Sequence, residues 1–290
     1  MGAMESDPVI VRALERLRSQ VRPDGGSPYY PGGRSSVEPT LLAALALSPT
    51  GAETDPVRPL LAWARKQQNP DGSLSLGFGQ SRQGLWVTAL AAAAFTRFGL
   101  AAEAKRALDF VLSSRSVTAA KDPMIGQDDT LPAWPWISGT SGWVEPTAWS
   151  LIALGLAGLA SHPRAQEGIR FLLDRQIPAG GWNYGNPSLS GKDLLPFWDT
   201  TGLALVALRG RTDAKDLAKR LGLLEQDQPR IESLSGLAWT VLGLESHGRN
   251  AGQARSRLLA VVDSLRDEEF HVGNFALGLI ALSESKVFIP

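Results

Sequence analysis

The sequence contains no cysteine, and it has only three histidines and three tyrosines among its 290 residues. The absence of cysteine excludes disulfide bonds, thiolate zinc sites, iron–sulfur clusters and a cysteine nucleophile. The 29 basic and 29 acidic side chains cancel, so no excess of positive charge favours binding to nucleic acid. The longest apolar run, near residues 89–95, is too short to cross a bilayer. We therefore expect neither a nucleic-acid partner nor a transmembrane segment.

Metal and cofactor signatures are also lacking. The three histidines, His162, His247 and His271, stand far apart in the sequence, whereas a zinc site needs at least three convergent ligands. No glycine-rich dinucleotide fingerprint follows a strand. The sequence therefore predicts no metal and no cofactor. The N-terminus has neither a basic nor an apolar leader segment, which predicts a cytoplasmic protein, and residues 1–4 resemble a remnant of cloning.

A short pattern recurs six times along the chain and indicates six similar helices. In its clearest copies an acidic residue stands two positions before a threonine, and an Ala-Leu pair ends seven positions after that threonine. These copies start at Thr40, Thr147 and Thr201, and looser copies start at Thr88, Leu237 and Phe275. The stretches are rich in Ala, Leu and Gly and apolar nearly all round, so we expect them to be buried helices.

More polar segments fill the intervals between these copies. They carry apolar residues at the i, i+3, i+4 spacing of an amphipathic helix, and they cover residues 9–20, 57–68, 101–112, 165–176, 214–224 and 251–265. Strand patterns are nearly absent. The chain is therefore predicted to be all-α, with residues 5–290 forming one domain. We expect six helical hairpins to close into an α/α toroid, with the apolar helices inside and the amphipathic helices outside.

A second motif lies after the amphipathic segments. Residues 168–172 are followed by Gln176, Gly180 and Trp182, which resembles the QW motif of squalene–hopene and related triterpene cyclases. A partial copy has Gln68 and Gly72 at the same spacing. The chain thus resembles the prenyltransferase/squalene-oxidase repeat superfamily over most of its length, as one toroid rather than the two domains of a full triterpene cyclase. We interpret the motif residues as structural, because Gln can bond the free carbonyls at a helix end and Trp can stack over them.

The resemblance also suggests a catalytic residue. Class II terpene cyclases start their reaction with a protonated Asp in a DxDD motif that precedes a similar helix. Alignment on Thr201 places Asp199 at the position of that proton donor, while Phe197 and Thr200 stand where the other two acids would be. A lone Asp at a helix N-terminus favours the ionised form. The resemblance therefore implies an incomplete, degenerate class II site.

Three acidic residues share one repeat position. They are Glu38, Glu145 and Asp199, and each stands two residues before the threonine that starts its copy of the pattern. A closed ring would therefore gather them at one end of its centre. The simplest interpretation is helix capping. The alternative is capping combined with a catalytic site, in which Asp199 acts with Glu145 and Glu38.

Aromatic residues stand close to the same helix starts. We predict that they line a central substrate cavity, and they are Trp86, Trp143, Trp149, Trp198, Phe197 and Tyr184. Aromatic faces with a few acids suit an isoprenoid polyene, whose developing cations they stabilise. They also suit a sugar, because inverting glycosidases use two carboxylates beside stacking rings.

Three functions therefore stay open. The first is a terpenoid-cyclase-like enzyme, an isomerase acting on an isoprenoid or polyene in the central cavity. The second is a non-catalytic module that binds a lipid or a protein partner on the same toroid. The third is a carbohydrate-active α/α-barrel enzyme with paired carboxylates. Fold alone does not decide among them.

Overall fold

The computed structural model describes residues 7–75, 84–121, 126–283 and 287–289, and these contain twelve α-helices. Residues 1–4, interpreted above as a cloning remnant, lie outside the described residues. Six helices form an inner ring: α2 (Val37–Leu47), α4 (Leu85–Arg97), α6 (Val144–Leu156), α8 (Trp198–Leu208), α10 (Leu234–Ser246) and α12 (Val272–Leu282). Six form an outer ring: α1 (Pro8–Arg18), α3 (Arg58–Lys66), α5 (Ala101–Ser113), α7 (Pro163–Asp174), α9 (Ala214–Asp227) and α11 (Gly252–Ser264).

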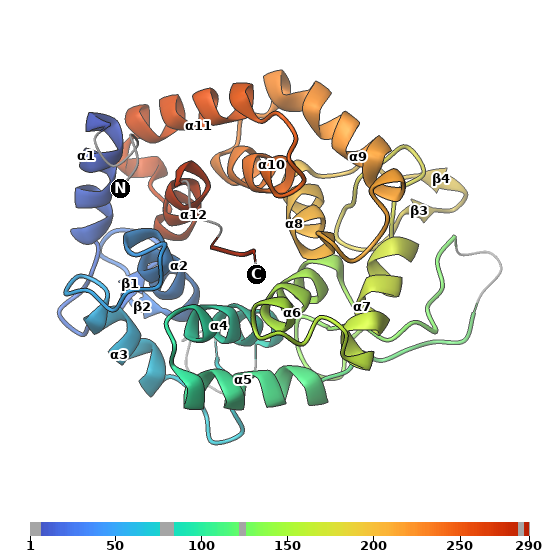
Figure 1. Ribbon diagram of the computed structural model, residues 1–290, viewed down its shortest axis with the longest axis horizontal. Helices are drawn as coiled ribbons and strands as arrows, with labels where there is room; N and C mark the ends of the chain where they lie inside the picture. The colour runs from blue at the N-terminus through green and yellow to red at the C-terminus, as the bar shows by residue number, and fades with distance from the viewer. Residues whose placement is uncertain (1–6, 76–83, 122–125, 284–286, 290) are drawn as a thin grey trace.

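The two rings close into a toroid, as predicted (Figure 1). Each inner helix packs on the next, and α12 packs on α2, so that the last repeat meets the first. The N-terminal helix α1 completes the outer ring, because it contacts both α11 and α12. The salt bridge from Arg12 to Asp263, at 2.7 Å, joins the same two ends. The all-α toroid of six hairpins is therefore confirmed.

The repeat pattern also locates the helices closely. Every inner helix begins three residues before the residue that starts its copy of the pattern. The helix with Thr40 begins at Val37, for example, and the helix with Phe275 begins at Val272. The outer helices start and end within three residues of the predicted segments. Inner helices are buried on nearly every side, whereas outer helices bury one face only. This difference is what their hydrophobic patterns predict.

A threonine at the start of the repeated pattern ties four of the inner helices to the loops before them. The hydroxyl of Thr201 accepts a hydrogen bond from the backbone N–H of Trp182 at 3.0 Å. Thr147 accepts one from Trp134 at 3.2 Å in the same way. Thr40 and Thr88 repeat the contact with the N–H groups of residues 27 and 74. The threonine thus has a structural role, because it satisfies a buried N–H group that would otherwise lack a partner.

Tryptophan and glutamine side chains link the outer helices to their neighbours. Trp182 is fully buried, and its indole N–H donates to the carbonyl of Leu172, near the end of α7, at 2.7 Å. Gln68 donates to the carbonyl of Glu103 on the next outer helix at 3.0 Å. Gln176 likewise accepts a hydrogen bond from Arg220 on α9. The Leu172 contact occupies a carbonyl in the last turn of α7 that has no partner within its own helix. The two glutamine contacts connect consecutive outer helices.

The middle of the ring is filled by aromatic side chains. Trp149 and Trp239 are the sixth residues of α6 and α10, and their ring centroids lie 5.4 Å apart. Phe288, from the C-terminal segment, packs on Trp149 at 5.2 Å and stacks on Trp239 at 5.8 Å. Figure 1 shows this C-terminal end inside the ring of inner helices. The chain thus inserts its own C-terminus between the inner helices, to about half their length.

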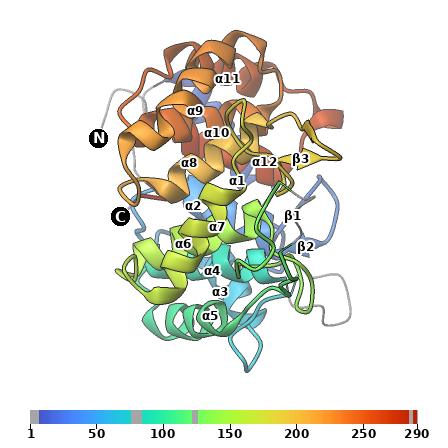
Figure 2. The same cartoon turned by 90° about the vertical axis from the view of Figure 1, so that its right-hand side faces the viewer.

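Two short hairpins lie at the end of the toroid where the inner helices begin. Strand β1 (Ser27–Pro28) pairs with β2 (Ser35–Ser36) just before α2, and β3 (Ser188–Leu189) pairs with β4 (Lys192–Asp193) before α8. Figure 2 shows both hairpins at one end of the molecule. No helix among the described residues is long and apolar enough to cross a membrane.

Candidate active site

Three carboxylates gather where the inner helices begin. Glu38, Glu145 and Asp199 are each the second residue of their helix, in α2, α6 and α8. The same position is Trp86 in α4, and it is Ser235 and Gly273 in the last two inner helices. We call Glu38, Glu145 and Asp199 the acidic rim. All three side chains remain partly exposed to solvent.

Glu145 is the centre of the acidic rim in electrostatic terms. Burial raises its pKa from 4.5 to about 8, and the negative charges of Glu38 and Asp199 add to the rise. The carboxylate therefore lies within electrostatic reach of both other acids. Solvent touches part of the side chain, yet protein surrounds most of it, and such a recess disfavours the charged form. The raised pKa favours the protonated carboxylic acid form of Glu145 at neutral pH.

Glu38 is held by a tyrosine. Burial raises its pKa from 4.5 to about 7, while a hydrogen bond from Tyr29 acts in the opposite direction. The pKa of the Tyr29 hydroxyl is raised far above its usual value by burial and by the charge of Glu38. A hydroxyl with so high a pKa stays protonated and donates to the carboxylate.

Asp199 is fixed by the first turn of its own helix. Its Oδ1 accepts hydrogen bonds from the backbone N–H of Thr200 at 2.8 Å and from the Thr200 hydroxyl at 3.3 Å. The N-cap of α8 is Phe197 and carries no side-chain capping bond, so Asp199 engages an N–H group of the first turn from within the helix rather than as the cap expected from the sequence. The described residues contain no group of three or more His, Asp or Glu side chains that could hold a metal ion.

Two exposed aromatic rings border the acids on the α8 side. Tyr184 is 51% exposed and Phe197 is 41% exposed, and their ring centroids are 5.0 Å apart. Burial raises the pKa of Tyr184, and the charges of Asp199 and Glu145 raise it further. Tyr184 thus lies close to two members of the acidic rim, and both rings leave a large face open to solvent.

The four predicted tryptophans lie in different places. Trp86 takes the acidic position in α4, and its ring packs edge-on against Trp136 with centroids 5.8 Å apart. Trp143 precedes α6 and lines a separate pocket described below. Trp198 donates its indole N–H to Asp227 on α9 at 3.3 Å, which directs it toward the outer ring. Trp149 lies in the filled centre and is 4% exposed.

The sequence analysis missed three rings on the α2 side. Tyr29 and Tyr30 precede β2, and His271 precedes α12. The His271 ring lies 5.4 Å from Tyr29 and 5.1 Å from Tyr30. A signal for His271 was available, because it occupies the same repeat position as Trp143 and Phe197, directly before an inner helix. Tyr29 and Tyr30 lie in a loop that the repeat pattern does not cover.

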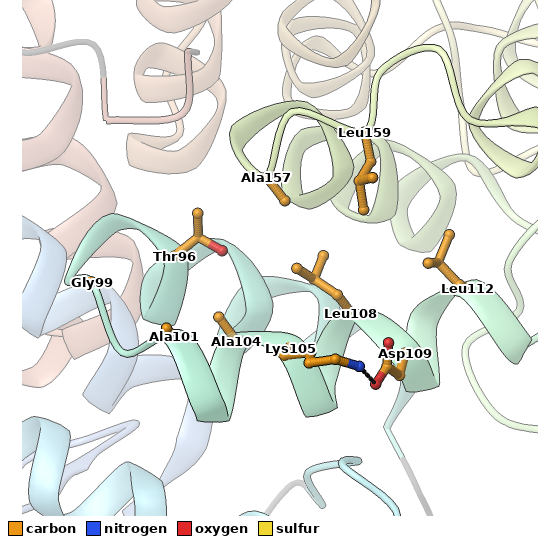
Figure 3. A pocket seen from close by; sticks show the side chains of 10 residues that line it. All are labelled: Thr96, Gly99, Ala101, Ala104, Lys105, Leu108, Asp109, Leu112, Ala157 and Leu159. Atoms are coloured by element: carbon orange, nitrogen blue, oxygen red, sulfur yellow. Dashed lines mark hydrogen bonds and ion pairs between the residues drawn. The ribbon is translucent and has the colours of Figure 1, made fainter.

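One pocket lies at the opposite end of the toroid. It has a volume of about 350 Å³ and is formed where α4 turns into α5, opposite the end of α6 (Figure 3). Leu108, Leu112 and Leu159 line it, and Lys105 pairs with Asp109 at its edge, 2.6 Å apart. None of its residues belongs to the acidic rim, so it is no part of this candidate site.

Comparison with known proteins addresses the fold. No protein-family model matches the chain, and no curated protein matches it. Among solved structures, an α-amylase from Clostridium perfringens is similar with a TM-score of 0.67 and 10% identity over 97% of this chain and 98% of that chain. An α-1,6-mannanase of Salegentibacter has a TM-score of 0.65 and 10% identity over 96% and 99%. The type II terpene cyclase MstE from Scytonema has a TM-score of 0.61 and 13% identity over 97% and 98%.

These identities are too low to transfer an activity, but the near-complete coverage of both chains shows a shared fold. Glycosidases and a terpene cyclase appear side by side among the similar structures, which matches two of the three functions left open by the sequence. The chain therefore has the α/α-toroid fold of the terpenoid-cyclase-like and α/α-barrel glycosidase proteins.

Proposed function

We propose that the chain is a carbohydrate-active enzyme that hydrolyses a glycosidic bond at the acidic rim. The observation that carries the proposal is the pKa of Glu145, which is raised to about 8 first by burial and then by the charges of Glu38 and Asp199. Glycoside hydrolysis requires one carboxylic acid with a raised pKa and one carboxylate beside it. Glu145 and Asp199 supply that pair from neighbouring helices.

The chemistry assigns a role to each acid. Glu145 would give its proton to the oxygen of the bond that breaks, and that oxygen leaves as a hydroxyl. Asp199 would take a proton from the water that attacks the anomeric carbon from the opposite side. Glu38, hydrogen-bonded to Tyr29, would support the protonated state of Glu145 through its charge.

The surroundings of the acids also favour a sugar over a polyene. Tyr184 and Phe197 offer open aromatic faces next to the acids, and such faces pack against the C–H groups of a sugar ring. A polyene cyclase needs a deep apolar chamber, but Trp149, Trp239 and Phe288 occupy the centre of this ring. A carboxylic acid with a pKa near 8 is also a weak proton donor for an alkene.

Terpenoid cyclisation is the second candidate. It is favoured by the position of Asp199, which matches the class II proton donor in the repeat frame, and by the similarity to the type II terpene cyclase MstE. In that case the chain would act as an isomerase on an isoprenoid. A third proposal, a non-catalytic lipid- or protein-binding module, would keep the same rim without turnover. For each of the three we propose a cytoplasmic location.

One experiment separates these candidates. The protein is incubated in parallel with mannan, starch, carboxymethylcellulose, squalene and geranylgeranyl diphosphate, and products are measured as reducing ends or by mass spectrometry. We expect new reducing ends from a polysaccharide, at least a hundredfold fewer with Glu145→Gln, and no cyclised isoprenoid. Cyclised product that disappears with Asp199→Asn would replace the proposal by the second candidate. The absence of turnover on all five substrates would favour the binding module.

A further inference from the structure

A second pocket lies beside the acidic rim. It has a volume of about 310 Å³ and is formed by the loop between α5 and α6 and the loop between α7 and α8. Its lining includes Gln127, Asp129, Trp143, Arg175 and Asn186. This size is at the small end of the range for ligand pockets in proteins, so it suits a single small unit rather than a long chain.

The pocket is lined by residues that are close in sequence to the acidic rim. Trp143 stands two residues before Glu145, and the backbone N–H of Val144 donates to the carbonyl of Tyr184 at 2.9 Å. Gly185, which follows Tyr184, also lines the pocket and lies against the ring of Trp143. A ligand in this pocket would therefore lie against the chain segments that lead directly to Tyr184 and to Glu145.

The polar side chains of the pocket are held in place by one another. Gln127 Nε2 donates to Asp129 Oδ1 at 3.0 Å and to Asn186 Oδ1 at 3.2 Å. Asp129 Oδ1 also accepts from Arg175 at 2.8 Å, and the Arg175 guanidinium lies over the ring of Phe171 at 4.4 Å. These contacts fix the planar groups before any ligand arrives, which lowers the entropy cost of binding.

Each of these planar groups keeps an unused polar edge. Within the described residues, no hydrogen bond engages Asn186 Nδ2, Gln127 Oε1 or Asp129 Oδ2. The groups that line the pocket with Trp143 thus offer one donor and two acceptors. Sugar hydroxyl groups both donate and accept hydrogen bonds, and the C–H faces of a sugar ring pack on an aromatic ring, so this set of groups fits a saccharide.

The charges argue against an anionic ligand. Arg175 is only 4% exposed, and both Asp129 and Asp174 form salt bridges with it. Lys121 lies 3.7 Å from Asp128 at the edge of the same loop. Arg175, the cation that lines the pocket, is thus already paired with carboxylates, whereas a phosphate or diphosphate would require an unpaired cation.

We propose that this pocket is a second saccharide-binding site, which holds one neutral sugar unit next to the acidic rim. The choice of ligand class rests on the proposed function. The site would bind a side branch or a remote unit of the same glycan whose bond is broken at Glu145. The substrate class would then be a neutral glycan that extends beyond the bond that breaks.

The test uses Glu145→Gln protein, so that binding is measured without turnover. Glucose, mannose, galactose, xylose and α-1,6-mannotriose are titrated by ligand-observed NMR, with inorganic pyrophosphate as the anionic probe. We expect a neutral sugar to bind with a millimolar dissociation constant and pyrophosphate not to bind. Adding Gln127→Ala and Asn186→Ala together should weaken the sugar at least tenfold. Gln166→Ala, which removes an exposed amide on α7 outside the pocket, should leave the affinity unchanged.

A second variant keeps the result independent of loop folding. Ala119→Trp adds a bulky side chain at an exposed wall of the pocket and should block binding without removing a polar group. The proposal would be overturned if pyrophosphate bound or if no sugar bound. It would also be overturned if the double variant and Ala119→Trp both bound the sugar as tightly as the Glu145→Gln parent. Sugar binding that depends on the pocket in a protein with no hydrolytic activity would refute the proposed function and leave this site standing. Hydrolysis with an unchanged KM in both pocket variants would refute this binding site and leave the proposed function standing.

Discussion

Phe288 packs edge-on against Trp149, with the two ring centroids 5.2 Å apart and the ring planes at 84°. This contact places the C-terminal segment in the middle of the inner ring, where a polyene cyclase would need an empty chamber. Phe288 is 2% exposed and also stacks on Trp239. The same contact therefore stabilises the toroid and limits the accessible part of the centre to the end that carries the acidic rim.

Removing this ring should destabilise the fold without abolishing the chemistry at the rim. Phe→Ala substitutions in protein cores cost about 3–5 kcal/mol, so Phe288→Ala should lower the free energy of unfolding by about that amount in urea denaturation. Leu195→Ala, at a side chain that is 79% exposed, should change stability by less than about 0.5 kcal/mol. A loss below about 1 kcal/mol for Phe288→Ala would show that the tail does not occupy the centre in solution.

The threonine at the start of the repeated pattern should matter through its hydroxyl group. Thr201→Val keeps the shape of the side chain but leaves the buried N–H of Trp182 without its acceptor. An unsatisfied buried donor costs about 1–3 kcal/mol, and we expect a loss of stability in that range by urea denaturation. Thr50→Val, at an exposed loop position, is the matched control and should be nearly neutral. Equal stability of the two variants would contradict the role assigned to the threonine.

Two helical glycines should respond to alanine with opposite signs. A Cβ at Gly202 in α8 would lie 2.2 Å from the carbonyl oxygen of Trp239 in α10, whereas a Cβ at Gly222 in α9 would meet nothing within 4 Å. Gly222→Ala should stabilise by about 0.5–1 kcal/mol, because alanine favours the helix. Gly202→Ala should destabilise by about 1–3 kcal/mol through overpacking. Thermal denaturation of both variants checks this, and stabilisation by both would mean that α8 and α10 are not in close contact.

Much of the architecture could be predicted because the repeat is periodic. The positions of Thr40, Thr147 and Thr201 located inner helices to within three residues of their starts, and small apolar residues on all sides correctly indicated burial. Ring closure also followed from the number of repeats. The meeting of Glu38, Glu145 and Asp199 at one end follows from closure, since equivalent helix starts in a closed ring face the same end.

The rest depends on contacts that have no local signal. Phe288 follows the last repeat, and nothing in the sequence around it indicates a partner such as Trp149. The pairing of Tyr29 with Glu38 depends on the path of a loop outside the repeat. Trp149 and Trp198 stand near predicted helix starts, yet the structure directs one into the core and the other toward α9. The sequence position of an aromatic residue on a helix did not determine which layer its ring faces.

Stability should fall as the pH rises, because the pKa of Glu145 is higher in the fold than its ordinary value. Between pH 4.5 and about 8 the folded chain holds a proton on Glu145 that the unfolded chain releases. By linkage, the stabilisation is complete below about pH 4.5 and is lost as the pH approaches 8. Glu38 acts in the same direction up to about pH 7. We expect the Tm to decrease from pH 5 to pH 8.5, and to decrease less in Glu145→Gln. A Tm that rises over this range in both proteins would contradict the raised pKa.

The charge of Glu38 should be visible in the ionisation of Glu145. Repulsion from Glu38 is one cause of the raised pKa of Glu145, second to burial. Glu38→Gln removes that charge, so the pKa of Glu145 should fall below about 8 while burial keeps it above 4.5. In the hydrolysis assay, this moves the alkaline limb of the pH–rate profile to lower pH, and ¹³C NMR of the glutamate carboxyls reports the same shift without substrate. Glu15→Gln, on the exposed face of α1, controls for the loss of a negative charge elsewhere. If both variants titrate Glu145 at the same pH, α2 and α6 do not share one acidic rim.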